Sequence, residues 1–165
     1  MSIERLAGIE PPILQYNWKV HIISGFVDTE DFKIRAQTAA LPSDASEPVI
    51  INYRWYHFDW PGRDAGEKTL EMTFFETESL PIIQGIYSWR VAIQNFGTGE
   101  QRRDPSQIMG RIEMDLLGAD DDVEGTYTLY YVWPENVTPD QMDYSGNEPL
   151  RITVTWHFAY YIFTT

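Results

Sequence analysis

The sequence has no cysteine and no long apolar run, and each absence excludes a class of protein. Without cysteine the chain has no disulfide framework, no thiolate metal ligand and no cysteine nucleophile, which fits a protein made in a reducing cytoplasm. No apolar run approaches the roughly 20 residues of a membrane-spanning helix. Residues 1–18 also lack the basic segment and apolar core of a signal peptide. We therefore expect no membrane anchor.

Basic residues are scarce. Twelve Lys and Arg against 25 Asp and Glu give a net charge of −13 at pH 7. Such a surface repels nucleic acid, because affinity for phosphate depends on Lys and Arg that displace counterions. Two interpretations remain open. The charge keeps an aromatic-rich chain soluble, or it forms a surface past which a polyanion moves without binding.

Aromatic residues are abundant, with 10 Tyr, 8 Phe and 6 Trp. Many lie in dense runs on either side of VWPENVTPDQMDYSGNEP, an acidic connector at 132–149 with no obvious catalytic residue. A chain of 165 residues is expected to form one domain, here 1–165, that buries roughly 70% of its unfolded surface. The composition therefore predicts a folded domain that is rich in aromatic packing.

Alternation of apolar and polar residues predicts a mainly β protein, a β-sandwich or partial barrel. The expected strands are 16–24, 32–40, 49–60, 67–77, 111–118, 125–133 and 148–163. Residues 1–15 are expected to form an irregular N-terminal arm. Residues 43–77 are expected to form a long hairpin with its tip at 61–66, where PGRDAG supplies turn residues.

One segment, 79–96, breaks the β pattern. Its apolar residues recur at the spacing of one helical face: Ile82, Ile86, Trp89, Ile93 and Phe96. Ser79 is the candidate N-cap and Pro81 lies in the first turn. We expect one α-helix that covers a sheet face.

The last strand is too long for a small domain. Residues 148–163 would extend about 50 Å at 3.3 Å per residue, whereas a domain of this size is about 40 Å across. One apolar face would run along its whole length: Leu150, Ile152, Val154, Trp156, Phe158, Tyr160 and Ile162. Either the strand bends at a bulge, or strands of several copies complete an inter-subunit β-barrel, which removes open edges.

The three histidines do not indicate a metal site or a general base. His21, His57 and His157 lie in strand patterns far apart in the sequence, without a third ligand nearby. The sequence also has no nucleophile elbow, phosphate loop or dinucleotide glycine fingerprint. We expect no catalytic residue, no cofactor and no metal, so the protein is not expected to be an enzyme.

Two charged clusters have simple interpretations. Asp120, Asp121, Asp122 and Glu124 lack the spacing of an EF-hand loop and are typical of a solvated turn. The basic spot 102–104 either forms inter-subunit salt bridges or lies exposed.

The order of elements resembles the tail tube proteins of contractile-tailed, T4-like bacteriophages. The matching stretches are YNWKVHII, FDWPGRDAGEKTLEMTF, LPIIQGIYSWRVAI and YYVWPENVTPDQMDYSGNEPLRITVTWHFAYY, which together span roughly 16–163. In that family an aromatic–proline pair, here Trp133-Pro134, follows the penultimate strand and precedes a long final strand that ends in aromatics. Trp133-Pro134 would end a strand, since proline cannot donate to the ladder.

The resemblance implies hexameric rings that share a β-barrel around a lumen and stack into a tube in the virion tail, assembled in the host cytoplasm. The implied partners are further copies of the chain, a tail sheath protein, baseplate and tail terminator proteins, and DNA that passes through the lumen without specific binding. A tube of a related contractile injection system, of the pyocin or secretion type, is an alternative that the resemblance leaves open. A carbohydrate-binding β-sandwich of a virion is the alternative from another class.

The resemblance also suggests functional residues. The hairpin tip would contact the neighbouring ring through Trp60, Pro61, Gly62, Arg63 and Asp64. The candidates for an acidic lumen are Glu71, Glu113 and Asp115, which alternate with apolar residues. A solvated outer face explains the same alternation, because alternation does not say which polar face is inside.

Overall fold

The structure is a computed structural model that describes residues 10–101 and 104–165. Its strands are β1 (Trp18–Ile23), β2 (Ala36–Ala39), β3 (Ser46–Tyr53), β4 (Tyr56–Asp64), β5 (Thr69–Phe75), β6 (Gly110–Leu117), β7 (Val123–Pro139), β8 (Arg151–His157) and β9 (Tyr160–Thr164). Its helices are α2 (Thr29–Arg35), α3 (Pro81–Ile93) and α4 (Pro105–Ile108). The mainly β class is confirmed, but the described residues form three helices where the sequence predicts one. No helix in this described part is long and apolar enough to span a lipid bilayer.

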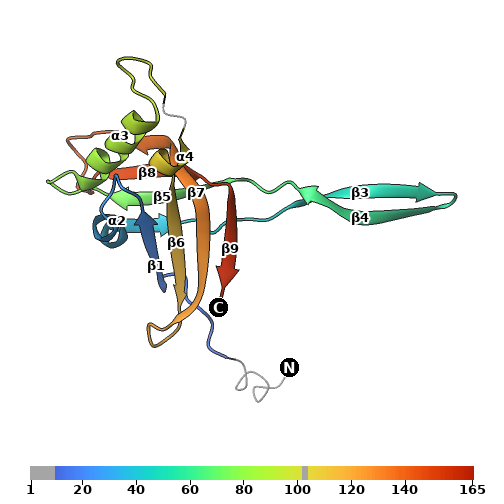
Figure 1. The fold of residues 1–165 in the computed structure, drawn as a ribbon. Coiled ribbons are helices and arrows are strands. Elements are labelled where there is room, and N and C mark those ends of the chain that lie inside the picture. Colours follow the sequence, from blue (N-terminus) through green and yellow to red (C-terminus); the bar gives the residue numbers. More distant parts are fainter. Residues whose placement is uncertain (1–9, 102–103) are drawn as a thin grey trace.

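Two antiparallel sheets form the body, and they share one strand (Figure 1). Sheet A contains β1, β6, the first part of β7, and β9. Sheet B contains the second part of β7, then β8, β5 and β2. In Figure 1 the strands of sheet A run across the direction of β5 and β8. Both sheets are open, so residues 10–101 and 104–165 form no closed barrel.

The strand β7 turns the corner between the sheets. Residues 123–132 pair with β6 and residues 133–139 pair with β8. Tyr131 has φ 55°, and the register shifts between Pro134 and Asn136. The prediction that Trp133-Pro134 ends a strand is therefore wrong, because the proline falls beside a bulge, where the ladder is already interrupted. The rest of the acidic connector forms an exposed loop.

The final segment also bends, so it is not one long strand. It divides at Phe158-Ala159 into β8 in sheet B and β9 in sheet A. The bend reverses the alternation: Phe158 is fully buried, whereas Tyr160 and Ile162 are 44% and 46% exposed. Both halves pair with β7 of the same chain. The length of this segment therefore does not require pairing with other copies.

The expected strand at 32–40 is replaced by helix α2 and the short strand β2. Asp28 caps the helix, since its Oδ1 accepts hydrogen bonds from the amides of Glu30 and Asp31 at 2.9 and 3.2 Å. An acidic first turn and a basic last turn complement the helix dipole. Phe32 packs edge-on against Phe74. The prediction failed because FKIR alternates like a strand. The residue that signals a helix start, Asp28, lies before the expected strand at 32–40.

The predicted helix in 79–96 is confirmed as α3, with Ile82, Ile86 and Trp89 buried. Its N-cap is not Ser79. The cap position is Leu80, whose side chain makes no capping hydrogen bond. The buried carboxylate of Glu76 accepts hydrogen bonds from free amides of the first turn instead. Glu76 Oε2 accepts from the Ile83 amide at 2.8 Å. A carboxylate at a helix N-terminus also interacts favourably with the helix dipole.

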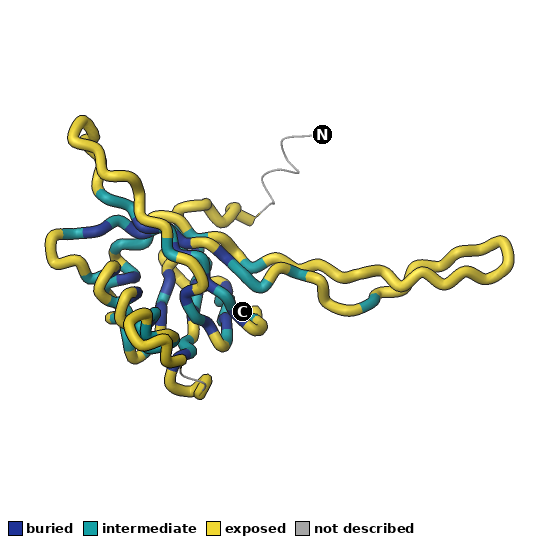
Figure 2. Tube along the Cα trace, turned by 90° about the horizontal axis from the view of Figure 1, so that it is seen from above, coloured by how far each residue is buried: buried dark blue, intermediate teal, exposed yellow. Residues whose placement is uncertain are grey.

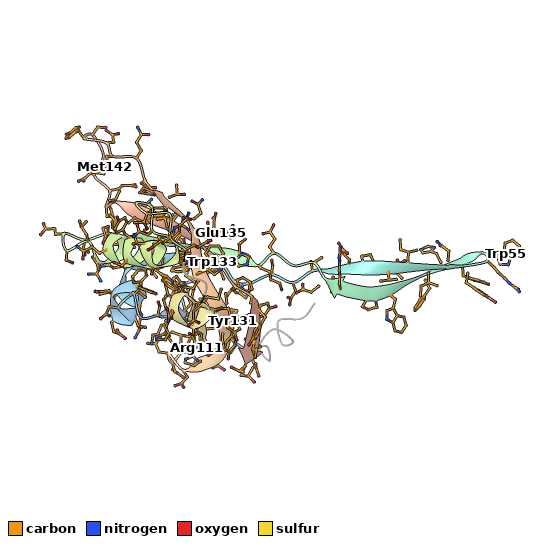
Figure 3. The ribbon with its side chains drawn as sticks, turned by 45° about the horizontal axis from the view of Figure 1, so that its top comes forward. Trp55, Arg111, Tyr131, Trp133, Glu135 and Met142 are labelled. Carbon is orange, nitrogen blue, oxygen red and sulfur yellow. The ribbon has the colours of Figure 1, made fainter. Side chains whose placement is uncertain are left out.

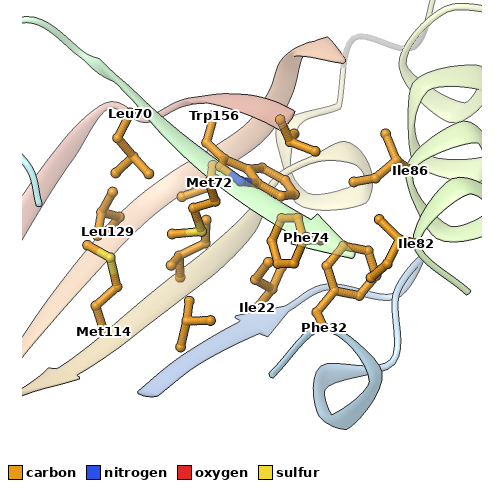
Figure 4. Packing of buried hydrophobic residues seen from close by; sticks show 14 of the residues in the cluster. Ile22, Phe32, Leu70, Met72, Phe74, Ile82, Ile86, Met114, Leu129 and Trp156 are labelled. Atoms are coloured by element: carbon orange, nitrogen blue, oxygen red, sulfur yellow. The ribbon is translucent and has the colours of Figure 1, made fainter. Parts of the chain in front are cut away.

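The core lies between the two sheets and under α3 (Figure 4). In each sheet, apolar residues on the inner side alternate with mainly polar residues on the outer side. The two inner sides pack against each other. Trp156 packs against Trp89 of α3 with 5.5 Å between ring centroids. The buried apolar residues of the two sheets are Val20, Ile22, Ile112, Met114, Leu117, Leu129, Val132, Leu70, Met72, Phe74, Ile152, Val154 and Trp156.

Candidate assembly surfaces

A two-stranded arm, β3 and β4, projects from the body (Figure 1) and is exposed along almost its whole length (Figure 2). It turns at Arg54-Trp55, between Tyr53 and Tyr56. Arg54 has φ 53°, and Trp55, at the far end of the arm, is 90% exposed (Figure 3). An isolated two-stranded ribbon is marginally stable in water. The arm is therefore an element that needs a partner surface.

One side of the arm is apolar and the other is largely polar. The register pairs Val49 with Trp60, Ile51 with Phe58 and Tyr53 with Tyr56, so these six side chains share one side. We call them the apolar arm face, and each is at least 50% exposed. The opposite side carries Ile50 beside Asp59 and Asn52 beside His57. The alternation was visible in VIINYRWYHFDW, but Arg54-Trp55 lacks the glycine or asparagine of a recognisable turn.

The predicted hairpin at 43–77 is wrong in its pairing, because the arm turns inside the expected strand 49–60 and the expected strand 67–77 contains β5 of sheet B. Residues 61–66 are not the tip of the arm: Pro61 to Asp64 belong to β4, and 65–66 lie at its root. Pro61 faces Pro48 in a ribbon without further strands, where a missing donor costs little. At Gly62 an added Cβ would lie 2.2 Å from the Glu47 carbonyl oxygen, so the glycine serves a close approach of two strands, not a turn.

Of the five residues expected to contact a neighbouring ring, Trp60 alone belongs to the apolar arm face. Arg63 pairs with Glu47 across the two strands at 2.7 Å, and both side chains are more than half exposed. Asp64 bonds to Lys68 and to the Gly66 amide, which lowers the pKa of its carboxyl. The structure thus places Pro61, Gly62, Arg63 and Asp64 between the apolar arm face and the body.

The root of the arm is attached to the body by side chains. The Tyr161 hydroxyl of β9 donates to the Asp44 carboxylate, which precedes β3. This bond raises the pKa of Tyr161 to about 12, because ionisation would place two negative groups together. The Ala65 amide also donates to the Ala45 carbonyl at 2.8 Å. The first of these bonds joins the root of the arm to β9, and the second joins the two segments of the root to each other.

The outward side of sheet A, here called face A, is a mixed surface. Because paired residues share a side, the register gives three rows across β1, β6, β7 and β9. They are Ile23, Arg111, Tyr130 and Tyr160; then His21, Glu113, Thr128 and Ile162; then Lys19, Asp115, Thr126 and Thr164. Tyr130 and Tyr160 stack with 5.0 Å between ring centroids. Arg111 is labelled in Figure 3.

The outward side of sheet B, here called face B, is more uniform. Its rows across β2, β5, β8 and β7 are Thr69, His157 and Trp133; then Glu71, Thr155 and Asn136; then Thr38, Thr73, Thr153 and Thr138; and finally Phe75 and Arg151. Trp133 packs on His157 with 5.3 Å between ring centroids. The third row places one threonine on each of the four strands.

The three lumen candidates lie on opposite sides of the molecule. Glu71 belongs to face B, whereas Glu113 and Asp115 belong to face A. Asp115 accepts from Thr126 Oγ1 at 2.7 Å and lies 3.2 Å from His21 Nε2. The structure therefore does not bring these carboxylates together, and one surface cannot contain all three.

The other clusters have local explanations. His157 pairs with Glu135 at 3.3 Å, and His57 lies on the polar side of the arm. Residues 120–122 form an exposed turn between β6 and β7. Within the described ranges, no three carboxylate or imidazole groups are placed to hold a metal ion. The basic pair at 102–103 and residues 1–9 of the N-terminal arm lie outside the described residues.

An apolar groove lies beside the start of β1. Its apolar lining includes Ile13, Leu14, Trp18, Leu41, Met114 and Leu116. Ile13, Leu14 and Leu41 are each more than 40% exposed. The groove and the apolar arm face are two exposed apolar surfaces formed by different parts of the chain.

The fold is of the tube type found in contractile injection systems. No family model matches the sequence. The chain superposes on the cap that terminates the tube of the anti-feeding prophage with a TM-score of 0.72 at 15% identity, over 96% of this chain and 94% of that one. It superposes on a chain of the extracellular PVC sheath–tube complex in the extended state with a TM-score of 0.68 at 16% identity, over 100% and 99%.

A curated relative found by sequence is itself a phage tail tube protein. The chain is 23% identical over 137 residues to the tail tube protein of Serratia phage KSP90, a match that covers 80% of this chain and 77% of the relative. The resemblance to phage tail tube proteins that the order of elements indicates is thereby confirmed.

Proposed function

We propose that this chain is a structural subunit of a phage tail tube, in which hexameric rings stack into a conduit with an acidic lumen through which DNA passes. The apolar arm face carries the proposal. Six apolar or aromatic side chains are aligned on one side of a ribbon that the described residues of the chain leave uncovered. Burial of each side chain is worth about 1.5–3 kcal/mol. A surface of this kind marks an interaction site.

The occupant that fits this face is a second copy of the chain. The arm and the apolar groove beside β1 are different surfaces, so an arm of one copy that docks in the groove of the next forms a head-to-tail contact. Contacts of this kind continue from copy to copy, either around a ring or along a filament. A tube needs contacts that repeat in this way.

The further partners follow from the same proposal. Sheath, baseplate and terminator proteins would contact the tube, the assembled tube would lie in the virion tail, and assembly would take place in the host cytoplasm. The solved relatives include a sheath–tube complex and a tube-terminating cap. The subunit acts by its shape and surface and performs no catalysis.

A tube of a related injection system is the second candidate. The observation in its favour is the likeness to the anti-feeding prophage and PVC proteins over nearly the whole chain. The two candidates share the subunit architecture and differ in cargo. Tubes recovered from particles that also contain packaged DNA would favour the phage tail.

Electron microscopy of the purified chain tests the proposal. Rings or filaments with a central channel are expected. The variant Ile51→Asp puts a charge on the apolar arm face and should abolish stacking while the body stays folded, as circular dichroism would show. Ile50→Asp is the matched control, because Ile50 is adjacent in β3, similarly exposed and on the opposite side of the arm.

Two results would contradict the proposal. One is a wild-type chain that stays monomeric at high concentration and binds glycans on an array, which would favour a carbohydrate-binding virion module. The other is an Ile51→Asp variant that assembles as well as Ile50→Asp, which would remove the arm from the interface.

A further inference from the structure

The two outward faces of the body differ in chemistry, and a tube places such faces in different surroundings. This inference rests on the proposed function and asks which face lines the lumen. In face B the third row runs Thr38, Thr73, Thr153 and Thr138, from edge strand β2 to β7. The hydroxyls of Thr73 and Thr153 lie 3.2 Å apart. Hydroxyl groups thus cross the whole sheet at one level.

Positive charge on face B is sparse. Among the described residues of its rows there is no lysine. Its arginine, Arg151, pairs with Glu148 at 3.2 Å, and His157 pairs with Glu135. Glu71 is exposed in the row next to the threonines. A polyanion in contact with the two middle rows of this face meets hydroxyls, one amide and one carboxylate, so few counterions would be released and little affinity gained.

Face A is less suited to a passing polyanion. Each face has one arginine in an ion pair, Arg111 on face A and Arg151 on face B, but face A also has the exposed Lys19 at one end of β1. The stacked Tyr130 and Tyr160 would offer aromatic rings to unpaired bases. Tyrosine and arginine are also the residues enriched at the centres of protein–protein contacts.

We propose that face B lines the lumen and that its four-threonine row forms a hydroxyl belt past which a polyanion slides. The row reaches both edges of sheet B, at β2 and at the second part of β7. Edge-to-edge joining of sheet B between copies would therefore continue the belt around the ring. Of the three lumen candidates, Glu71 lies in the lumen, and Glu113 and Asp115 lie on the outside of the tube.

The absence of cysteine makes the test direct. Thr153→Cys puts a thiol in the centre of face B, and Thr128→Cys puts one in the centre of face A. Both threonines lie half-buried on inner strands. Each variant is assembled and treated with a small maleimide or with a maleimide attached to a protein-sized carrier. We expect Thr153→Cys tubes to react with the small reagent and not with the carrier, and Thr128→Cys tubes to react with both.

The outcomes separate this inference from the proposed function. If the wild-type chain forms no tube, the proposed function fails. If tubes form and the Thr153 position reacts with the carrier, or the Thr128 position is the protected one, the tube stands and the lumen assignment is wrong. Should Thr153→Cys fail to assemble, Thr155→Cys on the same strand and face replaces it.

A charge variant tests the sliding surface itself. In Thr153→Lys tubes the belt contains a cation that every copy repeats, so a short single-stranded oligonucleotide should be retained at least about tenfold more than in wild-type tubes at low salt. The oligonucleotide retained by Thr153→Lys tubes should resist nuclease, because it lies in the lumen. Thr128→Lys tubes should retain nuclease-sensitive oligonucleotide, because their new charge lies outside. Equal retention by wild-type and Thr153→Lys tubes would overturn the belt as the contact surface.

Discussion

Two aromatic pairs of nearly equal spacing lie in opposite surroundings. In the body, Trp89 and Trp156 have ring centroids 5.5 Å apart and are fully buried. In the arm, the centroids of Phe58 and Trp60 are 5.6 Å apart, yet these residues are 56% and 58% exposed. Trp156 in β8 and the two arm residues in β4 all lie on strands with alternating apolar residues, while Trp89 lies on α3. The difference is that α3, which contributes Trp89, and a second sheet cover Trp156, whereas none of the described residues covers the arm pair.

The comparison shows whether the burial of apolar surface in each region stabilises the fold or an assembly. Burial in the body is complete within one chain, so it stabilises the fold. The apolar area of the arm leaves water when another surface covers it, so it stabilises an assembly. Substitutions in the body should therefore change unfolding, and substitutions in the arm should change association.

The largest effect is expected at Trp156. Trp156→Ala removes the side chain that fills the space under α3 and should lower the free energy of unfolding by about 3–5 kcal/mol. Urea denaturation of the unassembled chain measures this. The counterpart, Phe58→Ala in the arm, should change it by no more than about 0.5 kcal/mol. Similar losses in the two variants would show that the arm folds against its own body.

The next effect concerns association. Trp60→Ala should leave unfolding of the single chain unchanged and raise the concentration at which tubes form by about tenfold or more, since about 1.5–3 kcal/mol of burial is lost per contact. Sedimentation across a concentration series measures the threshold. Arg63→Ala is the control, because it removes an exposed ion pair worth little. An equal shift in both variants would contradict a contact centred on the apolar arm face.

A smaller effect is expected at the helix start. Glu76→Gln keeps the shape of the side chain and removes the charge that accepts from the Ile83 amide, which should cost about 1–2 kcal/mol of unfolding free energy. Glu78→Gln, two residues further on and exposed, is the matched control and should be neutral. If both variants unfold at the same urea concentration, the amides at the start of α3 do not depend on Glu76.

The smallest effect is expected at the root of the arm. The pKa of Tyr161 is raised to about 12 from 10.0, so its bond to Asp44 contributes fully below pH 10 and is lost as the pH rises toward 12. Spectroscopic titration of the tyrosines should show one late-ionising group that is absent in Tyr161→Phe. That variant should lose the small stability that the bond contributes near neutral pH, and it should increase hydrogen exchange in the arm. Identical titration curves would exclude this attachment.

Several features were predictable because their signals are local. The strands β1, β5 and β6 follow the period-2 alternation, and α3 follows the helical spacing of Ile82, Ile86 and Trp89. The bends in the long strands were not predictable from local signals. Bends at Tyr131 and Phe158 arise where two sheets meet, and the alternation on either side looks continuous in the sequence.

The candidate site was predicted in part. A hairpin was predicted between strands at 49–60 and 67–77, whereas the structure turns inside the first of these and places the second, as β5, in sheet B. Pro61-Gly62 resembles a turn more strongly than Arg54-Trp55 does, so the tip was misplaced. Glu71 and Asp115 look equivalent, because each alternates with apolar residues. Their separation onto two faces depends on which sheet each strand joins.

The sequence by itself determined the mainly β class, the helix, the one-sided apolar pattern of the arm and the scarcity of positive charge. These are properties of residue order and composition, and each acts over a few neighbouring residues. The tertiary structure alone decided which strands share a face, where the long strands bend and which apolar side chains stay uncovered. Strand pairing brings together residues that are far apart in the chain, and no local pattern contains that information.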